Sequence, residues 1–276
     1  MALDPLQRHG RSRAALKLIN QRPVTRLLDW GCGEGEFAEV VARTADFEVL
    51  ACDVDEHYVA AVRSRPSSRV TAVQVDDLRP RVELGDNTVD LVTCLDVLEH
   101  MGEESRIAAL SEIHRLLRSD GRLIITVPHH GLLHWADPEN VKFRVPRIHR
   151  AVYRFARGAA AYEATYGSAS RFGNYSLDGR WHNHFTRPEL IVMLKPRFRE
   201  DETIYFGLIH PIVRYLMYVH PMTARRLGRT GGGLFNRALW AAYIWDADHV
   251  GGALSYNLGM SFTPRTDITT SDVDGR

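Results

Sequence analysis

The sequence predicts an α/β protein with a doubly wound, mostly parallel sheet of seven strands and helices on both faces. Short apolar runs alternate with amphipathic segments through residues 26–127, and this alternation is typical of βαβ units. A glycine-rich turn, LLDWGCGEGEF at 27–37, stands where the first apolar run ends and a helical pattern begins. Acidic residues follow three successive apolar runs, so we expect them at the carboxyl edge of the sheet.

Each predicted strand is an apolar run bounded by polar or turn residues, and each predicted helix spaces its apolar residues three or four apart. The strands are expected at 26–30, 47–53, 69–75, 89–95, 121–127, 201–207 and 253–262. The helices are expected at 10–21, 36–45, 56–64, 103–118 and 188–195. Thr186 is the expected N-cap of the last of these helices.

The length and composition allow a sizeable core, since the chain has 276 residues of which 45% are hydrophobic. We expect a single domain over residues 1–264, with insertions at 129–186 and 208–252. The segment 265–276 is rich in Thr, Asp and Ser, and we expect it to be a flexible tail.

The composition also bears on partners and compartment. A net charge of +1 disfavours nucleic acid as a partner. Cys32, Cys52 and Cys94 fall at or near predicted strand ends, which is typical of buried residues in a reduced protein and not of a disulfide framework. The first residues, MALDPLQRHGRSR, lack the apolar core of a signal peptide. We therefore expect a cytoplasmic protein.

The glycine-rich turn is the most informative motif. Glycines let the backbone pass close to a ligand, and open α/β sheets bind nucleotide-like cofactors at turns that follow their strands. The spacing Gly31-x-Gly33-x-Gly35, with Asp29 just before it, differs from the G-x-G-x-x-G of dinucleotide sites, so a dehydrogenase is disfavoured. A plain strand–helix connector is the alternative interpretation.

Acids at the ends of the next two strands support a nucleotide-like ligand. Asp53 lies about 20 residues past the glycines, where an acid can accept hydrogen bonds from a ribose diol. Asp76 and Asp77 end the third strand, where an acid could meet an adenine amino group while Leu78 packs on the ring. Any one of these acids alone could instead belong to a surface turn.

With these motifs the chain resembles the class I S-adenosylmethionine-dependent methyltransferases. The similarity rests on LLDWGCGEGEF, CDVDE (52–56), VDD (75–77), VDLVTCLDVLEHM (89–101) and LLRSDGRLIITVP (116–128). It covers about residues 20–130 and implies S-adenosylmethionine as the cofactor and a last strand that runs antiparallel. The cofactor-binding residues that it implies are Asp29, Gly31, Cys32, Gly33, Gly35, Asp53, Val54, Asp76, Asp77, Leu78 and Leu95.

A candidate metal-binding turn, Asp96-Val-Leu-Glu99-His100, follows the fourth predicted strand. In a helical turn, positions i, i+3 and i+4 share one face, which brings two carboxylates and an imidazole together. This mixture of donors suits Mg²⁺, Mn²⁺ or Zn²⁺. His182 and His184, in WHNHFT at 181–186, are a second source of imidazole ligands.

These two segments are similar to those of two methyltransferase subgroups in which such a turn binds a divalent metal, the quinone-biosynthesis O-methyltransferases and the 3′-terminal small-RNA 2′-O-methyltransferases. The resemblance implies Asp96, Glu99, His100 and either His182 or His184 as ligands. Asp96 is one methylene shorter than the glutamate of those groups, which puts its direct contact with a metal in doubt. A metal-free pocket with structural roles for Glu99 and His100 is the alternative.

Methyl transfer from a sulfonium is an in-line displacement that needs the acceptor held in near-attack geometry. A bound metal would lower the pKa of an acceptor hydroxyl, whereas a metal-free enzyme would need a histidine as general base. The catalytic candidates are Asp96, His100, His129, His130, His134 and His184.

Our main hypothesis is an O-methyltransferase that acts on a hydroxyl of a small, sugar-like or natural-product-like molecule. Residues 142–157 carry several arginines and no acid, which favours a lid over a phosphate- or carboxylate-bearing acceptor. A solvated cationic helix face is the alternative. The competing functions are methylation of an RNA 3′-terminal ribose and a methyltransferase-like scaffold without turnover.

The insertion 208–252 and the residues before it hold two apolar stretches, 204–222 and 234–245, that are too interrupted or too short to span a bilayer. We expect helices that pack on the core of a monomer or homodimer. A monotopic membrane face is a less favoured alternative, for which Arg225, Arg226 and Arg229 would suit anionic headgroups.

Overall fold

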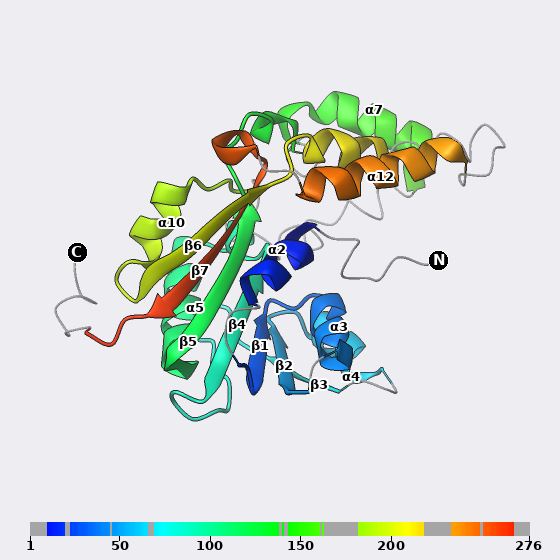
Figure 1. The fold of residues 1–276 in the computed structure, drawn as a ribbon. Coiled ribbons are helices and arrows are strands. Elements are labelled where there is room, and N and C mark those ends of the chain that lie inside the picture. Colours follow the sequence, from blue (N-terminus) through cyan, green and yellow to red (C-terminus); the bar gives the residue numbers. More distant parts are fainter. Residues whose placement is uncertain are drawn as a thin grey trace.

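One sheet of seven strands runs through the molecule (Figure 1). The strands are β1 (Arg26–Trp30), β2 (Glu48–Asp53), β3 (Val70–Gln74), β4 (Val89–Leu95), β5 (Leu117–Pro128), β6 (Phe198–Phe206) and β7 (Asn257–Pro264). Their order is β3-β2-β1-β4-β5-β7-β6, with β1 to β5 in parallel and β7 antiparallel to both neighbours. The predicted fold class is therefore confirmed. The computed structural model describes residues 10–19, 23–44, 46–65, 69–137, 140, 143–160, 162, 182–217, 233–248 and 251–267.

Helices cover both faces of the sheet. The longer ones are α2 (Gly10–Ile19), α3 (Glu36–Thr44), α4 (Glu56–Arg63), α5 (Glu103–Leu116), α7 (Pro146–Arg157), α10 (Arg187–Leu194) and α12 (Leu234–Asp248). The helices α2, α3 and α4 share one apolar core with the sheet, and α5 and α10 share another on the opposite face. Neighbouring strand residues alternate between the two cores, so Leu27 of β1 joins the first and Leu28 the second.

The last strand lies at a different position from the one predicted. We expected it at 253–262, but β7 covers Asn257–Pro264, and Gly252–Leu254 forms a single 3-10 turn. All eight residues of β7 are buried, because the strand pairs with β5 and β6 at its edges and is covered by helices on both faces. A strand enclosed in this way shows no clear alternation of polar and apolar residues, and its ends are hard to find in the sequence.

The junction between α5 and β5 also differs from the prediction. The helix ends at Leu116 instead of 118, and the strand begins at Leu117 instead of 121, so no loop separates them. The predicted N-cap of α10 is confirmed, because Thr186 and Glu189 form a reciprocal capping box. The three cysteines are free thiols, of which Cys52 and Cys94 are buried and Cys32 is half-buried.

The helices α7 and α12 form an upper layer beyond the carboxyl end of β5 (Figure 1). The first lies within segment 129–186 and the second within segment 208–252, which the sequence predicts as insertions. Residues 210–217 are also helical. Lys142, Trp181, the arginines at 225–229 and the tail 268–276 lie outside the described residues. Within the described part of the chain, no helix combines the length and apolarity needed to cross a bilayer.

Candidate functional site

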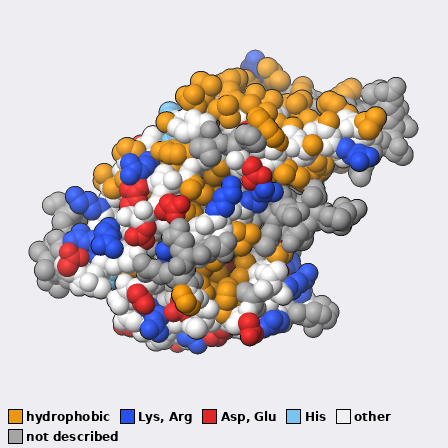
Figure 2. Space-filling model, in the orientation of Figure 1, with side chains coloured by type: hydrophobic (Ala, Val, Ile, Leu, Met, Phe, Trp, Pro, Cys, Tyr) orange, Lys and Arg blue, Asp and Glu red, His pale blue; other side chains and the backbone are white. Residues whose placement is uncertain are grey.

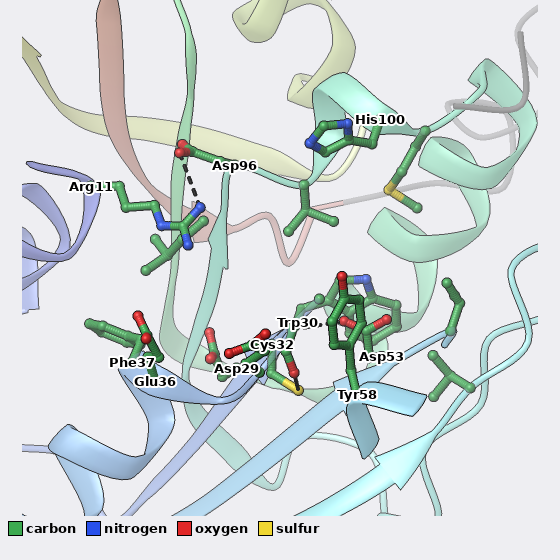
Figure 3. A pocket seen from close by; sticks show the side chains of 18 of the residues that line it. Arg11, Asp29, Trp30, Cys32, Glu36, Phe37, Asp53, Tyr58, Asp96 and His100 are labelled. Atoms are coloured by element: carbon green, nitrogen blue, oxygen red, sulfur yellow. Dashed lines mark hydrogen bonds and ion pairs between the residues drawn. The ribbon is translucent and has the colours of Figure 1, made fainter. Parts of the chain in front are cut away.

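A pocket of about 380 Å³ opens at the carboxyl ends of β1, β2 and β4 (Figure 3). Its wall includes ten of the residues predicted from the sequence, namely Asp29, Gly31, Cys32, Gly33, Asp53, Val54, Asp77, Leu95, Asp96 and His100. Asp96 and His100 lie on one side of the pocket, with Asp29, Cys32 and Asp53 on the other (Figure 3). The predicted convergence of strand-end acids and glycines is therefore present in the fold.

The glycine-rich turn has a backbone that only glycine adopts easily. Gly31, Gly33 and Gly35 have φ values of 71°, 51° and 71°. A Cβ at Gly31 would lie 2.5 Å from Val97 Cγ2, whereas a Cβ at Gly33 would meet nothing within 4 Å. Gly31 therefore allows close packing against the turn after β4, and Gly33 leaves the pocket open for a ligand.

Three predicted cofactor contacts do not line the pocket. Gly35 faces α4, where a Cβ would come within 2.6 Å of Val62 Cγ2. Asp76 Oδ1 accepts hydrogen bonds from the backbone N–H groups of Leu78 and Arg79, at 2.9 and 2.8 Å. Leu78 itself is 45% exposed. Asp76 thus shapes the turn after β3, and its neighbour Asp77 is the acid on the pocket wall.

Asp53 is tied to the glycine-rich turn. Its Oδ2 accepts a hydrogen bond of 2.9 Å from the backbone N–H of Gly33, and its Oδ1 accepts one of 3.0 Å from Asp55. Burial raises the pKa of Asp53 above its usual value, although these two bonds oppose the shift. The carboxylate therefore orders the turn and still borders the cavity.

Asp29 is the most deeply buried acid of the wall, with 3% of its surface exposed. Its Oδ1 accepts a hydrogen bond of 2.7 Å from the hydroxyl of Thr93 on β4. Burial raises the pKa of Asp29 to about 7, although the Thr93 bond and the charge of Arg11 act against that shift. A cation in the pocket would favour the ionised form of this carboxylate.

Asp96 lies at the end of β4 in a left-handed conformation, with a φ of 56°. Its Oδ1 accepts a hydrogen bond of 2.7 Å from the Thr126 hydroxyl, and its Oδ2 forms an ion pair of 3.3 Å with Arg11. Burial alone would raise the pKa of Asp96, but Arg11 and Thr126 outweigh it and hold that pKa below its usual value. Asp96 is therefore engaged with α2 and β5.

The other two members of the predicted metal turn meet His182. One side-chain donor atom each from Glu99, His100 and His182 lies within 4.8 Å of the others, and Asp96 is not part of this group. Glu99 is fully buried, and both of its carboxylate oxygens have no hydrogen-bond partner among the described residues. Its Oε1 lies 3.6 Å from Nε2 of His182, and burial raises the pKa of Glu99 to about 7.

Asp137 links the two histidines of the 182–184 segment. Its Oδ2 lies 2.8 Å from Nδ1 of His182 and 3.3 Å from Nε2 of His184, and donor atoms of the three residues lie within 4.8 Å of one another. Burial alone would lower the pKa of His182, but the carboxylates of Asp137 and Glu99 raise it to about 10. Burial lowers the pKa of His184 to about 4.

The remaining candidate bases lie outside the pocket wall. The Nδ1–H of His129 donates a hydrogen bond of 2.8 Å to the carbonyl oxygen of Ser255, and the side chain is buried beside Tyr205. The rings of His130 and His134 stack on each other at 3.8 Å. Of the histidines proposed as a base, only His100 borders the cavity.

Several residues around the site gave no signal in the sequence. Arg11 lies on a helix that was predicted, but nothing in the pattern directs its side chain to Asp96. Asp137 follows a histidine-rich stretch, and only the return of the chain at 182–184 reveals its two partners. Tyr58, on the first helical turn after β2, lines the pocket through its position on α4.

Comparison with known proteins shows a similarity to methyltransferases. A family model for a methyltransferase domain matches residues 28–125. The chain is 30% identical over 114 residues to a putative methyltransferase of Geobacillus sp., an alignment that covers 41% of this chain and 46% of that protein. It is 32% identical over 103 residues to the O-methyltransferase rstn1 of Aspergillus nomiae, covering 36% of this chain and 45% of the relative. The chain thus spans less than half the length of the curated relatives it matches.

A solved structure supports the fold over a longer range. An S-adenosylmethionine-dependent methyltransferase from Mesorhizobium loti superposes with a TM-score of 0.53 at 15% identity, covering 94% of this chain and all of the other. At this identity the likeness concerns the fold alone. Residues 28–125 are therefore similar in sequence to a methyltransferase domain, and the chain shares the fold of this solved methyltransferase.

Proposed function

We propose that this protein transfers the methyl group of S-adenosylmethionine to a hydroxyl of a small molecule. The observation that carries the proposal is the pocket in which the glycine-rich turn, Asp29 and Asp53 face Asp96 and His100. An adenosyl cofactor has a diol for an acid at the end of β2 and a cationic sulfonium for carboxylates near β1 and β4. Such a pocket supports both contacts.

Within this proposal, each wall of the pocket has a separate task. Asp53 would accept hydrogen bonds from the ribose hydroxyls, and Asp77 would border the adenine. Gly33 leaves room for the cofactor beside the glycine-rich turn, because a Cβ at this position would meet no protein atom within 4 Å. The cofactor supplies an already activated methyl group, so the protein has mainly to align the acceptor oxygen with it and to exclude water.

The buried group around Glu99 supports a divalent metal as part of the same proposal. The Glu99 carboxylate is buried without hydrogen bonds to the described residues and has the imidazole of His182 as its charge partner at 3.6 Å. A divalent ion held by Glu99, His100 and His182 would displace the proton of that imidazole and balance the carboxylate in its place. Carboxylate and imidazole donors together suit Zn²⁺ or Mn²⁺, and Asp137 would orient His182 as carboxylates commonly do for metal-bound histidines. When bound, the ion would lower the pKa of an acceptor hydroxyl.

Calorimetric titration with S-adenosylhomocysteine tests the cofactor site. Wild-type protein is expected to bind, and Asp53→Ala to bind about 10- to 100-fold more weakly, because it loses charge-assisted hydrogen bonds. Asp76→Asn is the matched control, since this acid lies outside the pocket and its amide can still cap the same turn. No binding by the wild type, or equal binding by Asp53→Ala, would overturn the cofactor assignment.

Release of S-adenosylhomocysteine in the presence of acceptors tests turnover. A panel of hydroxylated small molecules and a short RNA with a 3′-terminal ribose diol, each with and without Mn²⁺, separates the competing functions. Product from a small hydroxylated acceptor supports the proposal, whereas methylated RNA would redirect it to the RNA alternative. Cofactor binding without turnover on any acceptor would favour the non-catalytic scaffold.

A further inference from the structure

The helix α7 exposes its most apolar side chains. Ile148 and Phe155 are 61% and 60% exposed, and Val152 between them is half-buried. These residues are spaced four and three apart, so they form one stripe along the helix. Tyr153, by contrast, is buried at 4% exposure. A surface helix normally turns its apolar stripe toward the core, and α7 has the reverse orientation.

The neighbouring helix α12 has a similar outward stripe. Leu234, Ala238, Ala241 and Trp245 follow one another at helical spacing, and all four are exposed. The opposite side of α12, with Leu239 and Tyr243, is buried. The stripes of α7 and α12 together are called the apolar face below. Figure 2 shows hydrophobic side chains gathered along the upper side of the molecule, over these two helices.

Basic side chains accompany the apolar stripe of α7. Arg147, Arg150 and Arg154 are exposed and lie three and four residues apart, so they form a row beside the stripe. The sequence from 142 to 157 contains no acid. A helix with an apolar stripe and a row of arginines along one side of it is typical of helices that lie in the interfacial plane of a bilayer, with the charged side chains among anionic headgroups.

We propose that the apolar face binds the surface of a bilayer that contains anionic phospholipids. The helices α7 and α12 would lie along the membrane plane, with Ile148, Phe155 and Trp245 in the boundary between headgroups and acyl chains. This mode needs no membrane-spanning helix, and none is found in the described part of the chain. A second copy of the chain fits this face less well, because a two-fold contact along α7 would bring two arginine rows together.

The apolar face is also connected to the pocket. Arg13 and Lys17 of α2 form ion pairs with Asp248 at the end of α12, the second at 3.5 Å. The same helix α2 carries Arg11, which lines the pocket and pairs with Asp96. Helix α12 would therefore stand between the bilayer and α2, the helix that borders the site.

Flotation with vesicles tests the proposal. The purified protein is mixed with vesicles of phosphatidylcholine alone or of phosphatidylcholine with phosphatidylglycerol, and binding is measured at low and high salt. We expect binding to the anionic vesicles that weakens with salt. The double variant Ile148→Asp/Phe155→Asp should bind at least about tenfold more weakly, since it places charge in the apolar boundary. Arg147→Gln and Arg154→Gln should each weaken binding roughly fivefold.

The matched control is Val192→Asp on α10, which changes a 72% exposed apolar residue away from the apolar face. It should bind vesicles like the wild type, and circular dichroism should show all variants folded. The proposal is overturned if the wild type fails to bind anionic vesicles, or if the Ile148→Asp/Phe155→Asp variant binds them equally well. It is also overturned if light scattering shows that the double substitution converts a dimer to a monomer while vesicle binding stays the same. Cofactor binding is measured separately, so failure of either proposal is distinguishable from failure of the other.

Discussion

Arg11 and Asp96 form an ion pair of 3.3 Å across the pocket, although 85 residues separate them in the sequence. The pair joins α2 to the turn after β4, and Asp96 is not part of the group formed by Glu99, His100 and His182. Asp96 keeps a left-handed backbone while its side chain bonds to Thr126. Strain of this kind persists where the surrounding contacts determine the conformation.

Substitutions at Asp96 separate its backbone strain from its side-chain contacts. Asp96→Ala and Asp96→Gly both lose the bonds to Thr126 and Arg11, so both should destabilise the fold by about 1–3 kcal/mol. The alanine variant should be the less stable by about 1 kcal/mol, because a Cβ is unfavourable in the left-handed region. Urea denaturation measures the difference. The control is Ser111, an exposed helical residue, where the alanine variant should be more stable than the glycine variant. If Asp96→Ala is as stable as Asp96→Gly, the backbone at this position is not strained.

The glycines of the turn should respond differently to alanine. Gly31→Ala should destabilise the fold by about 3 kcal/mol, since it combines an unfavourable φ with a clash against Val97. Gly33→Ala should cost only about 1 kcal/mol of stability, because its Cβ meets no protein atom within 4 Å. Its main effect should be weaker binding of S-adenosylhomocysteine in calorimetry. Equal loss of stability in the two variants would show that the turn relaxes freely.

Asp29 should give the folded protein a pH dependence that Asp29→Asn lacks. A folded-state pKa of about 7, above the unfolded value near 3.8, means that the native state binds the extra proton between these values. Stability should therefore fall as pH rises from about 5 to about 8, by on the order of 2–3 kcal/mol more in the wild type than in Asp29→Asn. Urea denaturation at the two pH values measures this difference.

The control for Asp29 is Asp90→Asn. Hydrogen bonds from Thr25 and Arg26 outweigh the effect of burial and lower the pKa of Asp90, so this acid is ionised in both states above about pH 5. In Asp90→Asn, the free energy of unfolding should therefore change between the two pH values by the same amount as in the wild type. If the stability of the wild type falls with pH no more steeply than that of Asp29→Asn, Asp29 is ionised in the folded protein over this whole pH range.

Metal binding should depend on Glu99. Titration with Mn²⁺ should raise the thermal midpoint of the wild type, with a stabilisation of about 3 kcal/mol when the ion is at about 100 times its Kd. Glu99→Gln should lose this response, because an amide cannot neutralise the cation. His114→Gln is the control, since this histidine bonds to the backbone carbonyl of Arg265 and belongs to neither group of candidate metal ligands. The metal assignment fails if Mn²⁺ does not raise the thermal midpoint of the wild type and Glu99→Gln is at least as stable as the wild type.

Most of the fold and the core of the pocket could be predicted from the sequence because both depend on patterns of residues that are close together in the chain. Strands β1, β2 and β4 are mostly apolar, and the acids and glycines of the site lie at or just after their carboxyl ends. The carboxyl ends of parallel strands meet at one edge, so Asp29, Asp53 and Asp96 had to converge.

The parts that could not be predicted depend on long-range contacts. The apolar spacing of α7 and α12 indicates helices, but it does not say which side of each helix faces the protein. The pairing of Arg11 with Asp96, and of Asp137 with His182, joins segments whose approach is decided by the packing of whole elements. The limits of β7 were displaced because burial on both faces removes the alternation that marks a strand.

The central placement of β7 has a consequence for biosynthesis. Strand β6 ends at Phe206, but its hydrogen-bonding neighbour begins at Asn257, roughly 50 residues later. While a ribosome produces the intervening chain, the backbone edges of both β5 and β6 stay open, and such edges invite pairing with other nascent chains. Folding of this half of the molecule must therefore wait for translation, whereas the β1–β4 half can mature earlier.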